Sequence, residues 1–300
     1  MTNTICLDKN YSTTRLLTQE KPEIVNNPSD KFATVLFLPI GENRKGEGGL
    51  RTKGYFKKSY ENKPLISIIT VVFNGEKYLE ETIQSVISQT CDNVEYIIID
   101  GGSTDGTLDI IKKYEDKINY WVSEKDKGIY DAMNKGIDVV SGEWINFMNA
   151  GDSFYDSSVL EKLFTQNDLK NLGILYGNHA VKSENNSEVI QIDVKDYNWK
   201  RNIPFCHQSL FVRTSLLKNN LFDLQFKIAA DYDQFLRLKS QDVQILHLPL
   251  VISIYLDGGI SSVSRERLIK EYYKITKKYF FLYATFVYTI RILKFKILGK

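Results

Sequence analysis

From Pro64 onward, short apolar runs alternate with amphipathic stretches, and this alternation restricts the possible folds more than any other feature of the chain. The runs lie at residues 65–73, 94–100, 118–123 and 143–149, and apolar residues recur between them at helical spacing. Strands that alternate with helices are typical of βαβ units, whose right-handed crossovers make the strands parallel. The sequence therefore predicts an α/β fold with a mostly parallel central sheet flanked by helices.

Polar or acidic residues follow three of these runs. Asp100 ends the second run, Glu124 follows the third, and the turn at 149–152 follows the fourth. The carboxyl ends of parallel strands share one edge of the sheet, where ligands bind. Carboxylates gathered there repel one another unless a cation or hydrogen-bond donors are present, and a divalent ion bound to a diphosphate would meet that need. The alternative, simple helix capping, explains Asp105 well and Asp152 poorly.

The two ends of the chain differ from this alternating region. Residues 1–62 hold one apolar run, at 34–40, before a stretch rich in Gly and Lys, and we interpret them as a leader with one strand. Residues 63–260 form the predicted catalytic domain. Residues 261–300 form a basic, aromatic helical tail, with ten basic and two acidic residues counted from Arg265. We expect this tail to lie at a membrane interface, with packing on the domain as the alternative.

Composition argues against several classes of protein. A formal net charge of +2 gives no sign of nucleic-acid binding, so we expect no nucleic-acid partner. The three cysteines are far apart and have no metal-like spacing, which suits a reducing cytoplasm. The amino end shows no secretion signal. The longest uncharged stretch of the tail, Tyr279–Ile290, is too short to span a bilayer. We therefore expect a cytoplasmic protein, peripheral at the inner face of the cell membrane.

Four segments, in this order and spacing, resemble the family 2 glycosyltransferases. They are "ISIITVVFNGEKYLEETIQSVISQT", "EYIIIDGGSTDGT", "EKDKGIYDAMNKGI" and "FMNAGD". The resemblance covers residues 64 to about 260 and implies the GT-A fold, with a Rossmann-like sheet and a nucleotide-sugar donor. It also implies that Asp100 contacts the uracil of the donor, and that Asp105 and Glu124 lie near the nucleotide.

The same resemblance assigns the segment "NAGD" to the motif that holds a divalent metal, Mg²⁺ or Mn²⁺, against the diphosphate. Asp152 is then the metal ligand, and Gly151 belongs to the donor site. Many relatives carry two acids in this motif, whereas this chain has one. The metal would therefore depend on phosphate oxygens and water to complete its shell, which both ions accept.

Inverting transfer needs a base on the side of the sugar opposite the departing diphosphate. In the family that base is an acid at the start of a helix, and "KIAADYDQFLRLKS" at 227–240 has this form. The resemblance implies that Asp231 is the base, with Asp233 as the alternative. His207 and Gln208 are candidates for contact with acceptor or diphosphate, although a purely structural role fits them equally well.

These features together predict an inverting glycosyltransferase that uses a nucleotide diphosphate sugar, preferably a UDP-sugar, and a lipid-linked or polysaccharide acceptor. A guanosine donor is the alternative, because guanine also offers N–H donors to a carboxylate. A sugar nucleotidyltransferase would need a Gly- and Lys-rich loop directly after the first strand, and "VVFNGEKYL" matches that poorly. A non-catalytic nucleotide-sugar-binding protein on the same fold is the other alternative.

Overall fold

The four predicted strands form the centre of one sheet in the computed structural model. The structure describes residues 4–23, 34–41, 43–165, 169–182, 187–190, 198–200, 203, 205–257 and 265–287. The central strands are parallel and run in the order β4-β3-β2-β5; their bounds are β2 (Ile66–Val72), β3 (Val94–Asp100), β4 (Tyr120–Ser123) and β5 (Trp144–Phe147). The predicted α/β class with a parallel core is confirmed.

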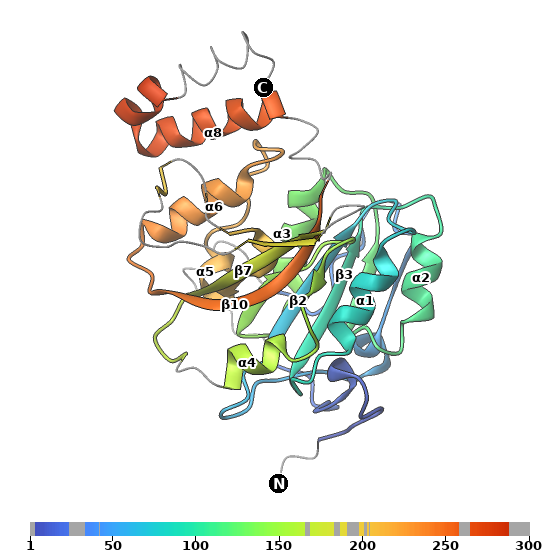
Figure 1. Ribbon diagram of the computed structural model, residues 1–300. Coiled ribbons are helices and arrows are strands. Elements are labelled where there is room, and N and C mark those ends of the chain that lie inside the picture. The colour runs from blue at the N-terminus through green and yellow to red at the C-terminus, as the bar shows by residue number, and fades with distance from the viewer. Residues whose placement is uncertain are drawn as a thin grey trace.

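The helices cover both faces of this sheet, as Figure 1 shows. Their bounds are α1 (Leu79–Ile87), α2 (Thr107–Lys113), α3 (Ile129–Val139), α4 (Val159–Thr165), α5 (Thr214–Lys218) and α6 (Ala230–Lys239). Successive side chains of a strand point to opposite faces. Ile66 and Ile68 pack with α1 and α4, whereas Ile69 and Val71 pack with α3 and α6. The central strands are therefore continuous apolar runs because both faces are buried.

Beyond β5 the sheet continues with mixed strand directions. These strands are β9 (Leu210–Arg213), β7 (Ile174–Lys182), β10 (Ile245–Leu256) and β6 (Ser153–Phe154), with β8 (Ser187–Ile190) paired to β7. The short 3₁₀ helix η3 (His207–Ser209) leads into β9. Because β3 and β5 lie on opposite sides of β2, the chain order reverses there, and α/β folds bind ligands at such a point.

The described residues of the amino-terminal segment pack against the main domain. Residues 34–40 form no strand; instead β1 (Gly46–Gly48) pairs with β4 at the edge of the sheet. The remaining elements here are η1 (Ser12–Thr14) and η2 (Leu50–Lys53). Arg51 lies 2.5 Å from the buried Glu95 carboxylate of β3. The packing of this segment depends on polar contacts that hydrophobic periodicity does not reveal.

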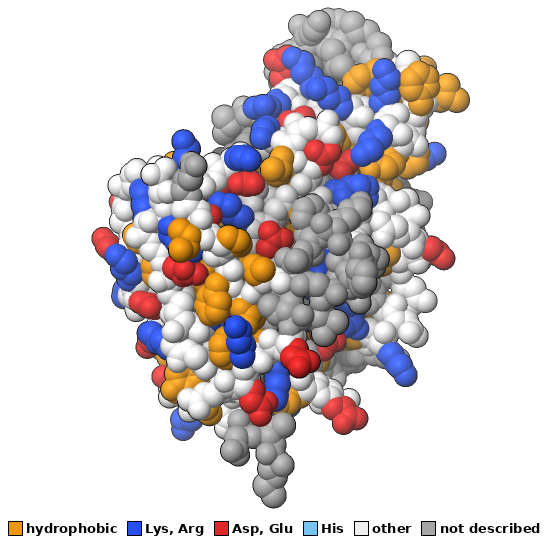
Figure 2. Space-filling model, turned by 180° about the vertical axis from the view of Figure 1, so that it is seen from behind, with side chains coloured by type: hydrophobic (Ala, Val, Ile, Leu, Met, Phe, Trp, Pro, Cys, Tyr) orange, Lys and Arg blue, Asp and Glu red, His pale blue; other side chains and the backbone are white. Residues whose placement is uncertain are grey.

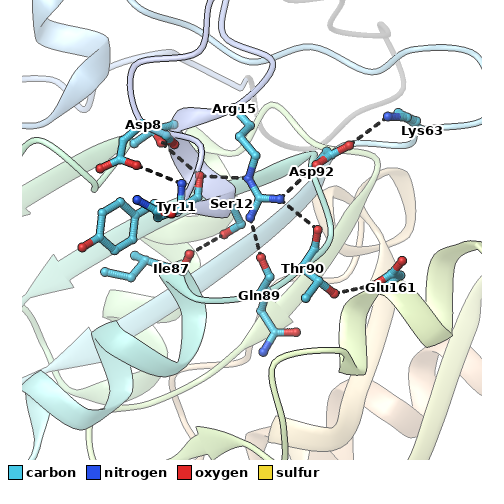
Figure 3. A network of polar contacts seen from close by, with 12 residues as sticks. Asp8, Tyr11, Ser12, Arg15, Lys63, Ile87, Gln89, Thr90, Asp92 and Glu161 are labelled. Atoms are coloured by element: carbon cyan, nitrogen blue, oxygen red, sulfur yellow. Dashed lines mark hydrogen bonds and ion pairs between the residues drawn. The ribbon is translucent and has the colours of Figure 1, made fainter.

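One such group of contacts joins the first residues of the chain to the end of α1 (Figure 3). The Arg15 guanidinium donates to the carbonyl oxygens of Gln89 and Thr90 and pairs with Asp92 at 3.0 Å. Lys63 pairs with the same carboxylate at 2.9 Å. The Arg15 region of the chain is therefore fixed to the end of the sheet opposite the expected ligand edge.

The carboxyl-terminal helix α8 (Arg265–Tyr279) packs on the domain, above α6 in Figure 1. Its Glu271 is buried and accepts hydrogen bonds from the backbone N–H groups of residues 227, 228 and 229, just before α6. For α8 the structure agrees with the alternative of packing on the domain, and binding of the tail to a membrane stays a prediction. No helix within the described ranges is long and apolar enough to cross a bilayer.

Candidate active site

A pocket of about 590 Å³ opens at the carboxyl ends of the parallel strands. Its walls come from the ends of β2 and β3, the start of α3 and the turn after β5; they include Phe73, Gly101, Asp126, Ile129 and Asn149. Its position at the reversal of strand order and its size suit a nucleotide-sized ligand.

Asp126 is the carboxylate in the wall of this pocket. A Cβ atom on Gly101 would lie 2.5 Å from Asp126 Oδ2, so the absence of a side chain at position 101 leaves room for this carboxylate. Its Oδ1 accepts from the Gly128 N–H at 2.7 Å. Burial raises the pKa of Asp126, although that hydrogen bond opposes the shift. Sequence reasoning missed Asp126, and the only signal was a second acid two positions after Glu124.

Asp100, which was expected to contact the nucleotide base, ends β3 as predicted but is not among the residues that line the pocket. Its carboxylate is fully buried and accepts from the Ser103 N–H, the Ser103 hydroxyl and the Ser123 hydroxyl. These bonds fix the loop that follows β3. The contact of Asp100 with a nucleotide base stays a prediction, since its carboxylate is occupied by protein donors and is not among the side chains that line the pocket.

The other two acids expected near the nucleotide are also held by protein groups. Asp105 accepts from the Thr107 N–H at 3.0 Å and from the Glu76 N–H at 3.1 Å, which caps α2, as the alternative interpretation had it. Glu124 is buried between Arg44 at 2.8 Å and Lys135 at 2.8 Å. Neither side chain is among those that line the pocket, and their place near the nucleotide stays a prediction.

Gly151 and Asp152 form a tight turn against α1. Gly151 has a φ of +100°, which L side chains rarely adopt, and its N–H donates to the Thr82 hydroxyl at 3.0 Å. That hydroxyl in turn donates to the Asp152 carbonyl at 2.7 Å. The turn directs the Asp152 carboxylate inward, where Gln208 Nε2 donates to it at 2.6 Å.

The Asp152 carboxylate is buried, and the hydrogen bonds it accepts from the described residues come from neutral donors. Burial raises its pKa to about 7, against the weaker effect of its bonds from Gln208 and the Leu256 N–H. Nearby, Asn149 Oδ1 is buried and lacks a hydrogen-bond partner among the described residues. Within those residues no three His, Cys, Asp or Glu side chains gather as a metal site. The oxygens present fit a cation held by one carboxylate and completed by phosphate and water.

Asp231 lies in the first turn of α6, close to His207. The distance from Asp231 Oδ2 to His207 Nδ1 is 4.0 Å, and His207 Nε2 lies 2.7 Å from the side-chain nitrogen of Asn149. Burial raises the pKa of Asp231 to about 6 and lowers the pKa of His207 to about 4. At neutral pH the imidazole is therefore uncharged, and the carboxylate is ionised and able to accept a proton.

Asp233, the alternative base, has a structural environment. It is fully buried and pairs with Arg237 at 2.8 Å and with Lys278 of α8 at 3.2 Å. Its negative charge is therefore compensated, unlike that of Asp231. Two neighbours in the chain contact the other two predicted acids: Gln208 bonds to Asp152, and His207 faces Asp231.

Comparisons with known proteins agree with this geometry. Residues 67–221 match the family model described as glycosyl transferase family 2. A PGL/p-HBAD biosynthesis glycosyltransferase of Mycobacterium bovis is 31% identical over 206 residues, which cover 66% of this chain and 80% of the relative.

Two solved structures are similar in fold. The structure of Staphylococcus aureus TarS residues 1–349 with UDP-GlcNAc superposes with a TM-score of 0.58 at 22% identity; the match covers 70% of this chain and 64%, just under two thirds, of that one. The mannosyltransferase PcManGT of Pyrobaculum calidifontis, solved with GDP-Man and Mn²⁺, gives a TM-score of 0.54 at 18% identity, covering 73% of this chain and 65% of that one.

Proposed function

Because this chain belongs to the family 2 glycosyltransferases, we propose that it is an inverting enzyme that moves a sugar from a uridine diphosphate sugar to a lipid-linked glycan or polysaccharide acceptor. The observation that carries this proposal is the line of side chains from the pocket to the acid. Asn149 lines the pocket and lies beside His207, which faces Asp231. A donor at one end of this line and a base at the other are what in-line displacement requires.

In this proposal Asp231 accepts the proton of the acceptor hydroxyl as that oxygen attacks the anomeric carbon. A pKa of about 6 suits this role, since the carboxylate is mostly ionised at pH 7 yet basic enough to take a proton. The neutral His207, 4.0 Å from this carboxylate, adds no positive charge beside it. Asp152 would hold Mg²⁺ or Mn²⁺, which when bound offsets the charge of the departing diphosphate.

We assign recognition of the uracil ring of the donor to Asp126, in place of Asp100. A carboxylate accepts a hydrogen bond from uracil N3–H, and Asp126 is the acid that lines the pocket. Both a uridine and a guanosine nucleotide occur in solved structures of similar fold: TarS was solved with UDP-GlcNAc and PcManGT with GDP-Man. The identity of the nucleotide therefore has to be measured on this chain.

The test is to incubate the full chain with Mn²⁺ and a panel of uridine and guanosine diphosphate sugars, and to measure the release of free nucleotide. We expect release from a uridine donor, and stronger protection from thermal unfolding by UDP than by GDP. Asp126→Ala should remove most of this preference, because the side chain that accepts from the base is lost. Stronger protection by GDP would overturn the uridine assignment, and no release from any donor would overturn the proposed activity.

We further propose that the end of the chain binds the inner face of the cell membrane. Helical residues 281–287, which follow α8, expose Phe281, Leu282 and Phe286 at 58%, 83% and 71%. Figure 2 shows apolar side chains beside basic ones at this end of the molecule. Exposed apolar residues next to cations favour an anionic lipid surface, at about 1 kcal/mol for each basic residue near it. Residues 288–300, which the prediction also included, lie outside the described residues.

Vesicles that contain anionic lipid test this second proposal. The full chain should pellet with them at low salt and be released at high salt, and Leu282→Glu should leave much more of it in the supernatant. Leu7→Glu is a matched control, because Leu7 is also an exposed leucine, at 47%, in the amino-terminal segment. Equal pelleting of the two variants would contradict membrane binding through residues 281–287. Truncation before α8 is unsuitable here, since it would also remove Glu271.

A further inference from the structure

A second pocket, of about 340 Å³, lies next to the pocket of about 590 Å³ at the carboxyl ends of the strands. We call that larger space the donor pocket. We call the second pocket the basic pocket; its walls are formed by residues 127–131, Leu224, residues 226–228 and Arg267. It shares Gly128 and Ile129 with the donor pocket, so the start of α3 lies between the two spaces. None of the site residues predicted from the sequence lies in it.

Three cationic side chains from separate parts of the chain line the basic pocket. Lys127 precedes α3, Lys227 precedes α6, and Arg267 belongs to α8. Arg267 lies 3.5 Å from Glu271. Lys127 and Lys227 are exposed, and among the described residues neither ammonium group belongs to an ion pair. The ammonium groups of Lys127 and Lys227 are therefore available to a ligand in this pocket.

One acidic side chain in the wall, Asp131, offsets part of this charge. It lies in the first turn of α3 and accepts from the Lys127 N–H at 3.0 Å, which holds its carboxylate at the start of the helix. The amino end of α3 itself carries partial positive charge from the helix dipole. The lysines and the helix end together favour a ligand with more than one negative charge.

The basic pocket also adjoins the proposed base. Ile228 in its wall precedes Asp231 by three residues, and the Tyr130 hydroxyl donates to the Ile228 carbonyl at 2.7 Å. Apolar side chains, Ile129, Leu224 and Phe226, line the same space. A molecule that combines an anionic group with an apolar chain would match both kinds of wall while keeping its sugar near Asp231.

We propose that the basic pocket binds a phosphate or diphosphate group of the acceptor, an inference that rests on the proposed glycosyltransferase function. The phosphate contacts Lys127 and Lys227, and Arg267 closes the side formed by α8. Such a group occurs in two kinds of acceptor, a lipid phosphate carrier and a phosphorylated glycan. The apolar part of the wall favours the lipid carrier.

Calorimetry with decyl phosphate, below its micelle concentration, tests the proposal on the full chain saturated with UDP and Mg²⁺. The titrations use the Leu282→Glu background, so that the exposed residues near α8 do not bind the alkyl chain. We expect decyl phosphate to bind at least about tenfold more tightly than the neutral decyl glucoside. The glucoside has no phosphate group and therefore cannot accept ion-paired hydrogen bonds from the lysines. Lys127→Ala and Lys227→Ala should each weaken binding by about tenfold, whereas Lys112→Ala, an exposed lysine on α2, should not.

The outcomes distinguish a lipid phosphate carrier from a phosphorylated glycan. They also distinguish failure of the phosphate site from failure of the proposed glycosyltransferase function. Binding of decyl phosphate without binding of glucose 1-phosphate supports a lipid carrier, and binding of both supports a phosphorylated glycan. Equal affinity for decyl phosphate and decyl glucoside, or unchanged affinity in both lysine variants, would overturn the basic pocket as a phosphate site. If UDP itself fails to bind in the initial saturation step, the proposed glycosyltransferase function is what fails.

Discussion

Asp231→Asn is expected to lower turnover by about 10²- to 10⁴-fold while leaving nucleotide binding nearly unchanged. This loss corresponds to about 3–5 kcal/mol of activation free energy, the range typical of a missing general base. Asparagine keeps an oxygen that can accept from the Tyr232 N–H, so the start of α6 should remain folded. Turnover and UDP affinity, measured on the same preparation, check both halves of the expectation.

Asp233→Asn is the matched control for that variant, because the same chemical change is made two residues away. Asp233 pairs with Arg237 and Lys278, so its neutralisation should lower the unfolding temperature through the loss of these pairs. Turnover per folded molecule should stay near that of the native enzyme. If Asp231→Asn retained native turnover and Asp233→Asn lost it, the two roles would have to be exchanged.

The pH dependence of the reaction should follow the same carboxylate. A base acts in its deprotonated form, and burial raises the pKa of Asp231 to about 6. Turnover should therefore fall as the pH drops through about 6. His207, whose pKa is lowered to about 4 by burial, stays neutral over that range and does not add a second limb.

Asp152→Asn is expected to abolish the gain in UDP affinity that Mn²⁺ provides. Changes to outer-shell partners of metals cost about 10- to 100-fold in affinity, and loss of the ligand itself should cost at least as much. Without metal and nucleotide, the variant should be at least as thermostable as the native protein. The reason is that a buried carboxylate without a cation is unfavourable, as its pKa of about 7 indicates, and asparagine removes this charge.

Calorimetry of UDP with and without Mn²⁺, together with thermal unfolding of the free protein, measures these opposite effects. Asp156→Asn serves as the control, since Asp156 is a nearby carboxylate that pairs with Lys162 at 3.0 Å on the surface. Retention of the full metal-assisted affinity in Asp152→Asn would show that the metal is held elsewhere.

The sequence predicted the parts of this structure that follow from periodicity. The run 94–100 matches β3 residue for residue, because a strand buried on both faces is apolar throughout and is recognisable as such. Asp152 and Asp231 were located by resemblance, at a turn and at a helix start that local sequence defines well. Local sequence indicates where these residues lie along the chain, whereas their side chains contact Gln208 and His207 from another segment.

The sequence indicated least where long-range polar contacts place the side chains. Asp100 was expected in the pocket, but Ser123 from the neighbouring strand occupies its carboxylate. Glu124 is held by Arg44, eighty residues earlier in the chain. Asp126 was overlooked because its position depends on the absence of a side chain at Gly101. The hydrophobic periodicity of the sequence does not indicate which distant hydrogen-bond donor contacts which acidic residue.

The contact of Glu271 with the backbone before α6 bears on how such enzymes can be recombined. The donor pocket is built from residues 71–150, whereas the proposed base, the basic pocket's Lys227 and the carboxylate that organises them come from the second half of the chain. A hybrid meant to inherit the acceptor choice of another relative would have to take the loop at 227–229 and α8 from the same parent. A junction between these segments would combine the loop of one parent with the α8 of another. The three N–H groups of residues 227–229 would then lose their hydrogen bonds if that α8 lacked a carboxylate at the position of Glu271.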